Sequence, residues 1–271
     1  MTCALLTTEP TFSDSGALAA ASLEGVPLCE GCMPGGSRLM SGDDGAQRIG
    51  PCDGRVAFEG VRLFNQAAIP ARYAHAALDT FNITPQGSSN EDLGAAHKLC
   101  NQWQRGYLPG NPQGLGGVVL SGPPGVGKTH LAVAILRALT LGKCVRCRFI
   151  DYVELVQIIK AGWDEGHGSA ALIEELATIE ILCIDDLGQG MTTEWNRSLI
   201  DTLVSRRYNA GLATLATTNF PLERSDRGTK ESGIRREVLA DRIGDRVLSR
   251  LTGGAALIPI NAGDYRQRTG R

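Results

Sequence analysis

The sequence contains few aromatic residues and no long apolar segment. Phe, Trp and Tyr make up 5% of the 271 residues, while hydrophobic residues make up 42% and charged residues 21%, a composition typical of soluble globular proteins. No run approaches the roughly 18 apolar residues that a membrane-spanning helix needs, so we expect no membrane partner. The formal net charge of −2 gives the molecule no overall positive field of the kind that announces nucleic-acid binding.

The N-terminus also lacks the pattern of a secretory leader. It has no basic stretch followed by an apolar run, and its first charged side chain is Glu9. We therefore expect a cytoplasmic protein without a signal peptide. In such a reducing compartment, the eight cysteines would be buried or bound to metal more often than paired in disulfides.

The hydrophobic pattern divides the chain near residue 82. We expect residues 1–28 to be a mobile tail or a weak helix, residues 29–52 a small loop-rich module, residues 56–67 a short helix and residues 84–90 a linker. Beyond the linker, short apolar runs alternate with segments of helical periodicity. Strands are expected at 118–120, 145–150, 179–184, 212–217 and 256–260, and helices at 91–105, 128–141, 152–161, 170–177, 193–209 and 234–251.

This alternation predicts an α/β fold in three layers, with a parallel five-stranded sheet covered by helices on both faces. We assign residues 83–271 to this domain and residues 1–82 to a small N-terminal module that contains cysteines. Gly142 follows the second expected helix, where it fits the left-handed conformation that commonly ends a helix.

One segment fits the phosphate-loop pattern G-x-x-x-x-G-K-[ST] in full. Its residues are Gly122, Pro123, Pro124, Gly125, Val126, Gly127, Lys128 and Thr129, and His130 follows directly. The glycines let the backbone wrap closely around phosphate, and the loop opens onto a helix N-terminus that favours an anion. Lys128 would reach the β- and γ-phosphates of ATP, and the Thr129 hydroxyl would bind Mg²⁺.

Polar residues end two of the expected strands. Asp185 and Asp186 follow the apolar run ILCI, and Asn219 follows LATT. Asp185 would hold Mg²⁺ and Asp186 would orient or deprotonate the attacking water, while Asn219 could position the same water. Asp and Asn also form turns readily, so these positions gain their meaning from the phosphate loop upstream.

Arginines recur at a spacing of four near the C-terminal end. Arg242, Arg246 and Arg250 would share one face of a single helix over residues 234–251. A solvated charged face is the ordinary interpretation of such spacing. Beside an ATP site, an arginine that reaches a neighbouring subunit's γ-phosphate is the alternative.

Several of these motifs occur together in one protein family. The segments are GPPGVGKTHLA at 122–132, ILCIDDLG at 181–188, ATTNFP at 216–221, DRVLSRL at 245–251 and GDYR at 263–266. From residue 118 to 266, the chain resembles the AAA+ helicase loaders of bacteria, the DnaC/DnaI group, whose close relative is the transposition helper ATPase IstB. Upstream, IPARYAHAALDTF at 69–81 resembles the loader segment that lies near the adenine.

The resemblance implies a P-loop NTPase fold of the AAA+ class and a role for each matching residue. Lys128 and Thr129 bind phosphate and Mg²⁺, Asp185 is the Walker B acid and Asn219 is sensor 1. Arg250 looks like the arginine finger through which subunits associate, and Arg266 looks like sensor 2. Many AAA+ enzymes have Glu where this chain has Asp186, and the shorter side chain implies slow hydrolysis and switch-like behaviour.

The resemblance further implies that single-stranded DNA contacts residues 148–152 and the helix after them, where Arg146, Arg148 and Lys160 supply positive charge. It also draws attention to the cysteines near the N-terminus. Cys29, Cys32 and Cys52 resemble part of a zinc knuckle, but the expected fourth cysteine is missing. Asp53, His75 or Cys3 could substitute, or the site could have decayed.

Two functions from different classes follow, together with a third reading. The first is an ATP-controlled helicase loader that binds a DnaB-like replicative DNA helicase through residues 1–82 and places it on single-stranded DNA. The second is an IstB-like helper ATPase that binds duplex target DNA and recruits a transposase. A small-molecule kinase would use the same phosphate loop, but Asn219 and Arg250 argue against it.

Overall fold

The computed structural model describes the chain in eight stretches. They comprise residues 10–23, 37–41, 45–51, 53–84, 90–110, 116–164, 170–224 and 237–265. Within these stretches, no helix combines the length and the apolar character needed to cross a membrane.

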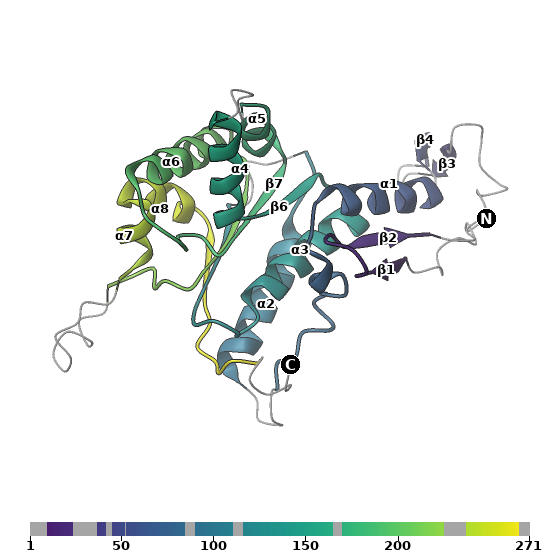
Figure 1. The fold of residues 1–271 in the computed structure, drawn as a ribbon. Coiled ribbons are helices and arrows are strands. Elements are labelled where there is room, and N and C mark those ends of the chain that lie inside the picture. Colours follow the sequence, from purple (N-terminus) through teal and green to yellow (C-terminus); the bar gives the residue numbers. More distant parts are fainter. Residues whose placement is uncertain are drawn as a thin grey trace.

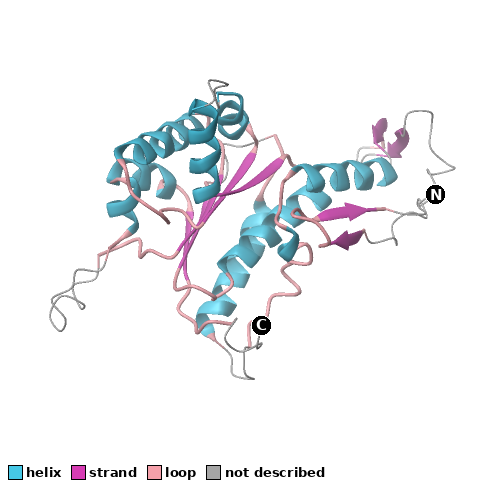
Figure 2. Ribbon diagram, viewed as in Figure 1, coloured by secondary structure: helices cyan, strands magenta, loops and turns pink. Residues whose placement is uncertain are grey.

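A parallel five-stranded sheet forms the centre of the molecule (Figures 1 and 2). Its strands are β5 (Val118–Ser121), β6 (Cys147–Asp151), β7 (Ile181–Asp185), β8 (Thr214–Thr218) and β9 (Ala256–Pro259), in the order β6-β7-β8-β5-β9. β5 leads into the phosphate loop and β7 ends in Asp185, and a single strand, β8, separates them in the sheet. The structure confirms the predicted sheet.

Helices cover both faces of this sheet (Figure 1). One layer contains α1 (Asp53–Gln66), α2 (Glu91–Gly106) and α3 (Lys128–Lys143), and the other contains α4 (Tyr152–Asp164), α5 (Ala170–Thr178), α6 (Glu194–Asn209), α7 (Leu239–Ile243) and α8 (Asp245–Thr252). The side chains of β5 alternate between the two layers, since Val118 and Leu120 join the first core and Val119 joins the second. This alternation is the period of two that a strand imposes.

Side-chain caps fix the starts of two helices near the predicted positions. Asn90 accepts a hydrogen bond from the Leu93 amide at 3.0 Å and begins α2. Thr193 accepts one from the Asn196 amide at 3.1 Å and begins α6. Each cap satisfies a backbone donor that would otherwise have no partner in the first turn.

Two predicted helix ends are wrong. Helix α3 continues through Gly142, and Cys144 takes the left-handed conformation with φ 52° and donates its amide to Leu139 and Thr140. The single helix expected over 234–251 is two helices where the chain is described, because Gly244, with φ 91° and ψ 149°, separates α7 from α8. A residue with these angles cannot continue an α-helix, so the side-chain faces of α7 and α8 are not continuous with each other.

Short strands occur near the N-terminus, within residues 1–28, where a tail or weak helix was expected, and within residues 29–52, where a small loop-rich module was expected. Strand β1 (Thr11–Ser13) pairs antiparallel with β2 (Ala20–Ser22), and β3 (Ser37–Ser41) pairs antiparallel with β4 (Gln47–Pro51). In Figure 1 the β3–β4 hairpin lies beyond the far end of α1, away from the sheet.

The segment before residue 82 packs directly on the α/β domain. Phe64 of α1 is fully buried in the core that also holds Leu131 and Ile135 of α3. The Ala67 carbonyl accepts a hydrogen bond from the Phe149 amide of β6 at 2.7 Å. Residues 53–81 therefore share a core with the sheet, while the division of the chain at residue 82 stays a proposal.

A buried arginine holds the second helix layer to the sheet. Arg207 of α6 is 0% exposed, and its guanidinium donates to the carbonyls of Leu176, Ile179 and Ala213 and to the Thr214 hydroxyl. Burial lowers the pKa of Arg207 to about 9. The carbonyls lie at the C-terminal end of α5 and just before β8, so one side chain joins α6 to both elements.

Candidate nucleotide site

The phosphate loop joins the end of β5 to the start of α3. Gly127 caps α3 with φ 94°, and a Cβ at this position would lie 2.6 Å from Cε2 of Phe81. Any residue other than glycine would therefore clash with the Phe81 ring as well as strain the backbone. The loop takes its shape at the carboxyl edge of the sheet, where parallel α/β folds bind their ligands.

Lys128 links this loop to the end of β8. Its ammonium donates to the carbonyls of Gly122 and Pro123 at 2.9 and 2.8 Å and to Oδ1 of Asn219 at 2.7 Å. The side chain is only 5% exposed. A buried cation held by neutral oxygens is suited to exchange them for phosphate oxygens, which offer full negative charge.

Asp185 lies next to the phosphate loop, in contact with the first turn of α3. Its Oδ1 accepts hydrogen bonds from Oγ1 of Thr129 at 2.9 Å and from Oγ1 of Thr217 at 2.6 Å. The residue is 2% exposed, and this burial raises its pKa to about 6, with the charge of Asp186 adding to the effect and the two hydroxyl bonds opposing it. The structure therefore brings together the two side chains that the sequence assigned to Mg²⁺.

These oxygens fit a divalent cation. A buried carboxylate with a raised pKa lacks compensating charge, and a hydroxyl beside a carboxylate is the oxygen ligand set that Mg²⁺ takes in phosphate-loop proteins. Thr129 and Asp185 would hold such a cation, which would supply the charge that compensates the buried carboxylate.

Asp186 and Asn219 face each other across the ends of β7 and β8. The Asn219 amide donates to Oδ1 of Asp186 at 3.3 Å. Asp186 has φ 50°, in the left-handed region, and its amide donates to the Thr217 hydroxyl at 2.9 Å. Because Asn219 also contacts Lys128, it connects the phosphate-binding side of the site to this second acid.

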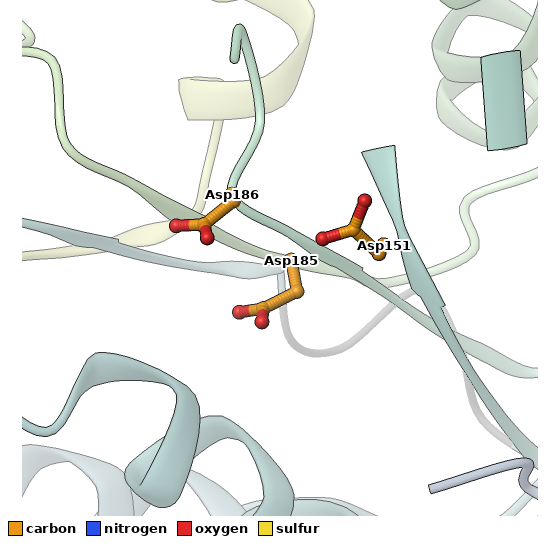
Figure 3. Close-up of side chains that lie close together, drawn as sticks. All are labelled: Asp151, Asp185 and Asp186. Atoms are coloured by element: carbon orange, nitrogen blue, oxygen red, sulfur yellow. The ribbon is translucent and has the colours of Figure 1, made fainter. Parts of the chain in front are cut away.

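A third carboxylate belongs to the same edge of the sheet, and sequence reasoning did not assign it there. Asp151 ends β6 in register with Asp185, and one oxygen each of Asp151, Asp185 and Asp186 lies within 4.8 Å of the others (Figure 3). Oδ1 of Asp151 accepts hydrogen bonds from the amides of Val153 and Glu154, so it also caps α4. The sequence signal for Asp151 was its position directly after the apolar run at 145–150, which parallels the position of Asp185.

Beside the loop lies a cavity of about 350 Å³ that extends toward the segment at 69–81. Arg72, Tyr73, Phe81 and Tyr265 are among the residues that line it. Burial raises the pKa of Tyr73, while its hydrogen bond to Thr129 opposes the rise. The aromatic and arginine side chains give the cavity the flat surfaces that a purine base packs on.

His130 holds the same segment in place. Its Nε2 lies 2.9 Å from the Ala77 carbonyl, and its ring centroid is 5.4 Å from that of Phe81. Burial lowers the pKa of the imidazole. His130 lines the cavity, but its ring nitrogen is engaged by backbone, so its part is to position Phe81.

Known proteins match this chain in sequence and in fold. Residues 115–271, more than half of the chain, match the family model described as IstB-like ATP binding protein. The chain belongs to this family.

Two solved structures and one curated relative agree with the family. Over 210 residues the chain is 26% identical to the replicative helicase loader DnaC of Escherichia coli (strain K12), in an alignment that covers 76% of each protein. A crystal structure of the DnaC helicase loader matches with a TM-score of 0.57 and 33% identity over 70% of this chain and 98% of that one. A crystal structure of DnaI matches with a TM-score of 0.57 and 20% identity, over 71% and 94%, which shows the shared fold.

The arginines of this IstB-like chain lie in two different places. Arg242 is in α7, where it donates to the carbonyls of Gly188, at 2.9 Å, and Gly190. Arg246 and Arg250 are in α8, and both contact Oδ1 of Asp201, at 3.6 and 3.1 Å. The prediction that all three share one face of one helix is therefore wrong, because Gly244 separates Arg242 from the others.

Arg250 lies at the edge of the sheet opposite to the phosphate loop. It lines a second hollow together with Gly116, Gly117 and Gly254, which directly precede or approach the starts of β5 and β9. The phosphate loop follows the end of β5. Arg250 therefore lies away from the phosphate loop of its own chain.

The remaining predicted residues divide into two groups. Arg266, Cys29, Cys32 and Cys52 lie outside the described residues, so their roles stay predictions. Arg148 donates to the Gln66 carbonyl at 3.3 Å and lies 3.7 Å from Glu175, and Lys160 lies 5.2 Å from the Trp195 ring centroid. Both cations have partners within the chain, which DNA phosphates would have to replace.

Proposed function

We propose that this protein is an ATP-hydrolysing switch that loads a replicative DNA helicase onto single-stranded DNA. The relation to the helicase loader DnaC supports the process. The observation that carries the proposal is the pair of contacts at the carboxyl edge of the sheet, Lys128 with Asn219 and Thr129 with Asp185. This pairing supports a site in which Lys128 binds phosphate and Asp185 binds the metal ion.

In this proposal, the chain's own residues divide the work of hydrolysis. Lys128 and the loop amides hold the β- and γ-phosphates, and Thr129 and Asp185 hold Mg²⁺, which when bound neutralises charge on those phosphates. Asp186 and Asn219 orient the attacking water between the ends of β7 and β8. Because Asp186 is shorter than Glu and is held by Asn219, we expect hydrolysis to be slow.

In this proposal, Arg250 supplies positive charge to the nucleotide site of a neighbouring subunit. Its position at the opposite edge of the sheet supports a head-to-tail contact, in which one subunit's Arg250 meets the next subunit's γ-phosphate. Such an arginine typically raises the rate by about 10³–10⁵, so hydrolysis would depend on assembly. We assign Arg266 to sensor 2 of the same site by resemblance alone.

The N-terminal module would bind the helicase. Leu39 and Ile49 are direct cross-strand partners in the β3–β4 hairpin and are 59% and 69% exposed. Two large apolar side chains exposed side by side on a hairpin favour contact with another protein. We also propose that the cysteine cluster at Cys29, Cys32 and Cys52 binds zinc and stabilises this module.

The test is direct binding to a hexameric replicative helicase, followed by size-exclusion chromatography with and without ATP. We expect a complex that forms with the wild-type chain and weakens in Ile49→Asp. Glu59→Ala, on the exposed side of α1, is the matched control and should bind normally. A wild-type chain that never co-elutes with the helicase would exclude the loader function.

A second candidate function follows from the family itself. The IstB-like match covers residues 115–271, which include the phosphate loop, and an IstB-like helper would form ATP-dependent oligomers on duplex DNA and recruit a transposase. Electrophoretic shift assays with single-stranded and duplex DNA of equal length separate the two functions. Preference for duplex DNA, together with no affinity for helicase, would favour the transposition helper.

A further inference from the structure

A single 3-10 turn, η2 (Ala71–Tyr73), connects the β1–β2 hairpin to the candidate nucleotide site. At the start of this turn, the chain pairs with the residues that join β1 to β2. The Ala19 amide donates to the Ile69 carbonyl at 2.7 Å. The Ala71 amide donates to the Ala17 carbonyl at 3.0 Å, and the two bonds form an isolated antiparallel bridge. The start of η2 and the hairpin therefore hold each other in place.

The other end of the turn contacts the expected metal site. The Tyr73 hydroxyl forms a hydrogen bond with the Thr129 side chain. Oγ1 of Thr129 also lies 2.9 and 3.1 Å from the two carboxylate oxygens of Asp185, to which it donates its only proton. Tyr73 is therefore the donor in its bond to Thr129. Because Tyr73 and Thr129 both line the cavity beside the phosphate loop, the phenol lies on the side from which a nucleotide would enter.

We propose that Tyr73 is a positioning residue that competes with the metal ion of a bound nucleotide for the Thr129 hydroxyl oxygen, and that its release loosens the bridge to the β1–β2 hairpin. An oxygen that accepts a hydrogen bond from a phenol has one lone pair fewer for a divalent cation. Tyr73 must then move when Thr129 becomes a metal ligand. Only one residue separates Tyr73 from Ala71, so this movement reaches the bridge. The inference rests on the proposed nucleotide site.

Two other contacts keep the hairpin on the domain when Tyr73 moves. The Asn65 side chain of α1 accepts from the Ala21 amide at 2.7 Å and donates to the Ala21 carbonyl at 3.1 Å. The guanidinium carbon of Arg137, in α3, lies 3.8 Å from the centroid of the Phe12 ring. We therefore expect the hairpin to loosen at the bridge to η2 and to stay attached at Asn65 and Arg137.

The first measurement is the affinity of the full-length chain for ATP, with saturating magnesium and with EDTA, by isothermal titration calorimetry. Tyr73→Phe removes the hydroxyl and keeps the ring, whose centroid lies 4.7 Å from the guanidinium carbon of Arg72. We expect the ratio of the two affinities to rise about fivefold in this variant, as the loss of one competing hydrogen bond predicts. The affinity in EDTA should not change. A hydroxyl that only shapes the cavity would change the affinity in EDTA and leave the ratio as it was.

The second measurement is amide hydrogen exchange, read by NMR with and without magnesium and a non-hydrolysable ATP analogue. In the wild type, we expect binding to speed exchange about fivefold at Ala19 and Ala71, which form the bridge, and not at Ala21, which Asn65 holds. In Tyr73→Phe, exchange at Ala19 and Ala71 should already be fast without nucleotide and should change little on binding.

Tyr107→Phe is the matched control. It removes a phenolic hydroxyl that donates to Glu180 at 3.0 Å, and Tyr107 is not among the residues that line the cavity, so both measurements should match the wild type. The proposal is wrong if Tyr73→Phe leaves the affinity ratio unchanged or lowers it, or if exchange at Ala19 in the wild type does not respond to binding. A wild-type chain that binds no ATP even with magnesium would refute the proposed nucleotide site itself.

Discussion

Neutralising Asp185 should stabilise the nucleotide-free protein while it destroys the metal site. The carboxylate is 2% exposed, and burial raises its pKa from 3.8 to about 6. A shift of this size corresponds to about 3 kcal/mol of unfavourable free energy in the ionised native state. Asn keeps the shape and one acceptor oxygen for Thr129 and Thr217, so Asp185→Asn removes the charge with little change in packing.

The sign of the pH dependence follows from the raised pKa. Between about pH 4 and pH 6 the native state binds a proton that the unfolded state has released, so this site makes stability fall as pH rises. The destabilisation is absent below about pH 4 and complete above about pH 6. The advantage of Asp185→Asn should therefore be greatest near pH 7.5 and disappear near pH 4.

The assay is urea unfolding in EDTA, so that no divalent cation compensates the charge. We expect Asp185→Asn to raise the free energy of unfolding at pH 7.5 by about 1–3 kcal/mol, below the full value because the new amide needs an acceptor. Asp14→Asn, at an exposed position, controls for the general loss of one negative charge. Magnesium and ATP should then stabilise the wild type through binding and leave Asp185→Asn unchanged.

The opposite result is informative. If Asp185→Asn unfolds at lower urea than wild type at pH 7.5 in EDTA, the ionised carboxylate is not a source of strain in the native state. The assignment of Asp185 as a buried carboxylate whose charge is compensated by a bound cation would then lose its physical basis.

Four further predictions concern other parts of the molecule. Lys128→Ala should abolish ATP binding in a fluorescent-nucleotide titration yet unfold normally; retained binding would exclude the phosphate-loop assignment. Arg250→Ala should bind ATP like wild type but lose the increase in hydrolysis at high protein concentration, about 10³-fold if Arg250 acts in trans, whereas Arg246→Ala keeps it; full hydrolysis in Arg250→Ala would leave the arginine a surface residue. Arg207→Met should lower the free energy of unfolding by about 3 kcal/mol, because several buried carbonyls lose their donor; a loss below about 1 kcal/mol would mean that water replaces the guanidinium. Cys29→Ser should remove bound zinc measured by elemental analysis, and a wild-type chain without zinc ends that proposal.

The candidate nucleotide site could be predicted because its residues form motifs whose spacing is visible in the sequence. The phosphate loop is a contiguous pattern, and Asp185 and Asn219 follow short runs whose length and position favour strands. Parallel strands bring their carboxyl ends to one edge, so the expected topology alone places Lys128, Asp185 and Asn219 around one cleft. The contacts of Lys128 with Asn219 and of Thr129 with Asp185 follow from that topology.

Other features depend on partners that lie far away in the sequence. Arg207 sits in an Arg-Arg pair that looks like helix surface, and its burial follows from carbonyls on α5 and β8. Asp151 follows an apolar run as Asp185 does, but only the register between β6 and β7 brings the two residues side by side. The break at Gly244 could have been predicted, because in Ile-Gly-Asp the glycine can end one helix and the Asp can begin the next. The regular spacing of the arginines favoured a single helix instead.

The position of Arg250 connects the fold to assembly. In a parallel sheet, the loop that binds phosphate and the residues that begin the strands are separated by the length of the strands, here four or five residues, which is about 13–17 Å at the rise of a strand. An arginine beside the start of β9 cannot cross that distance to its own site. It can reach a γ-phosphate only when another subunit's carboxyl edge is stacked on it, and Asp201 holds the guanidinium at the surface where that stacking would occur. If Arg250 acts in trans as proposed, hydrolysis per subunit should rise with protein concentration in the wild type and stay flat in Arg250→Ala.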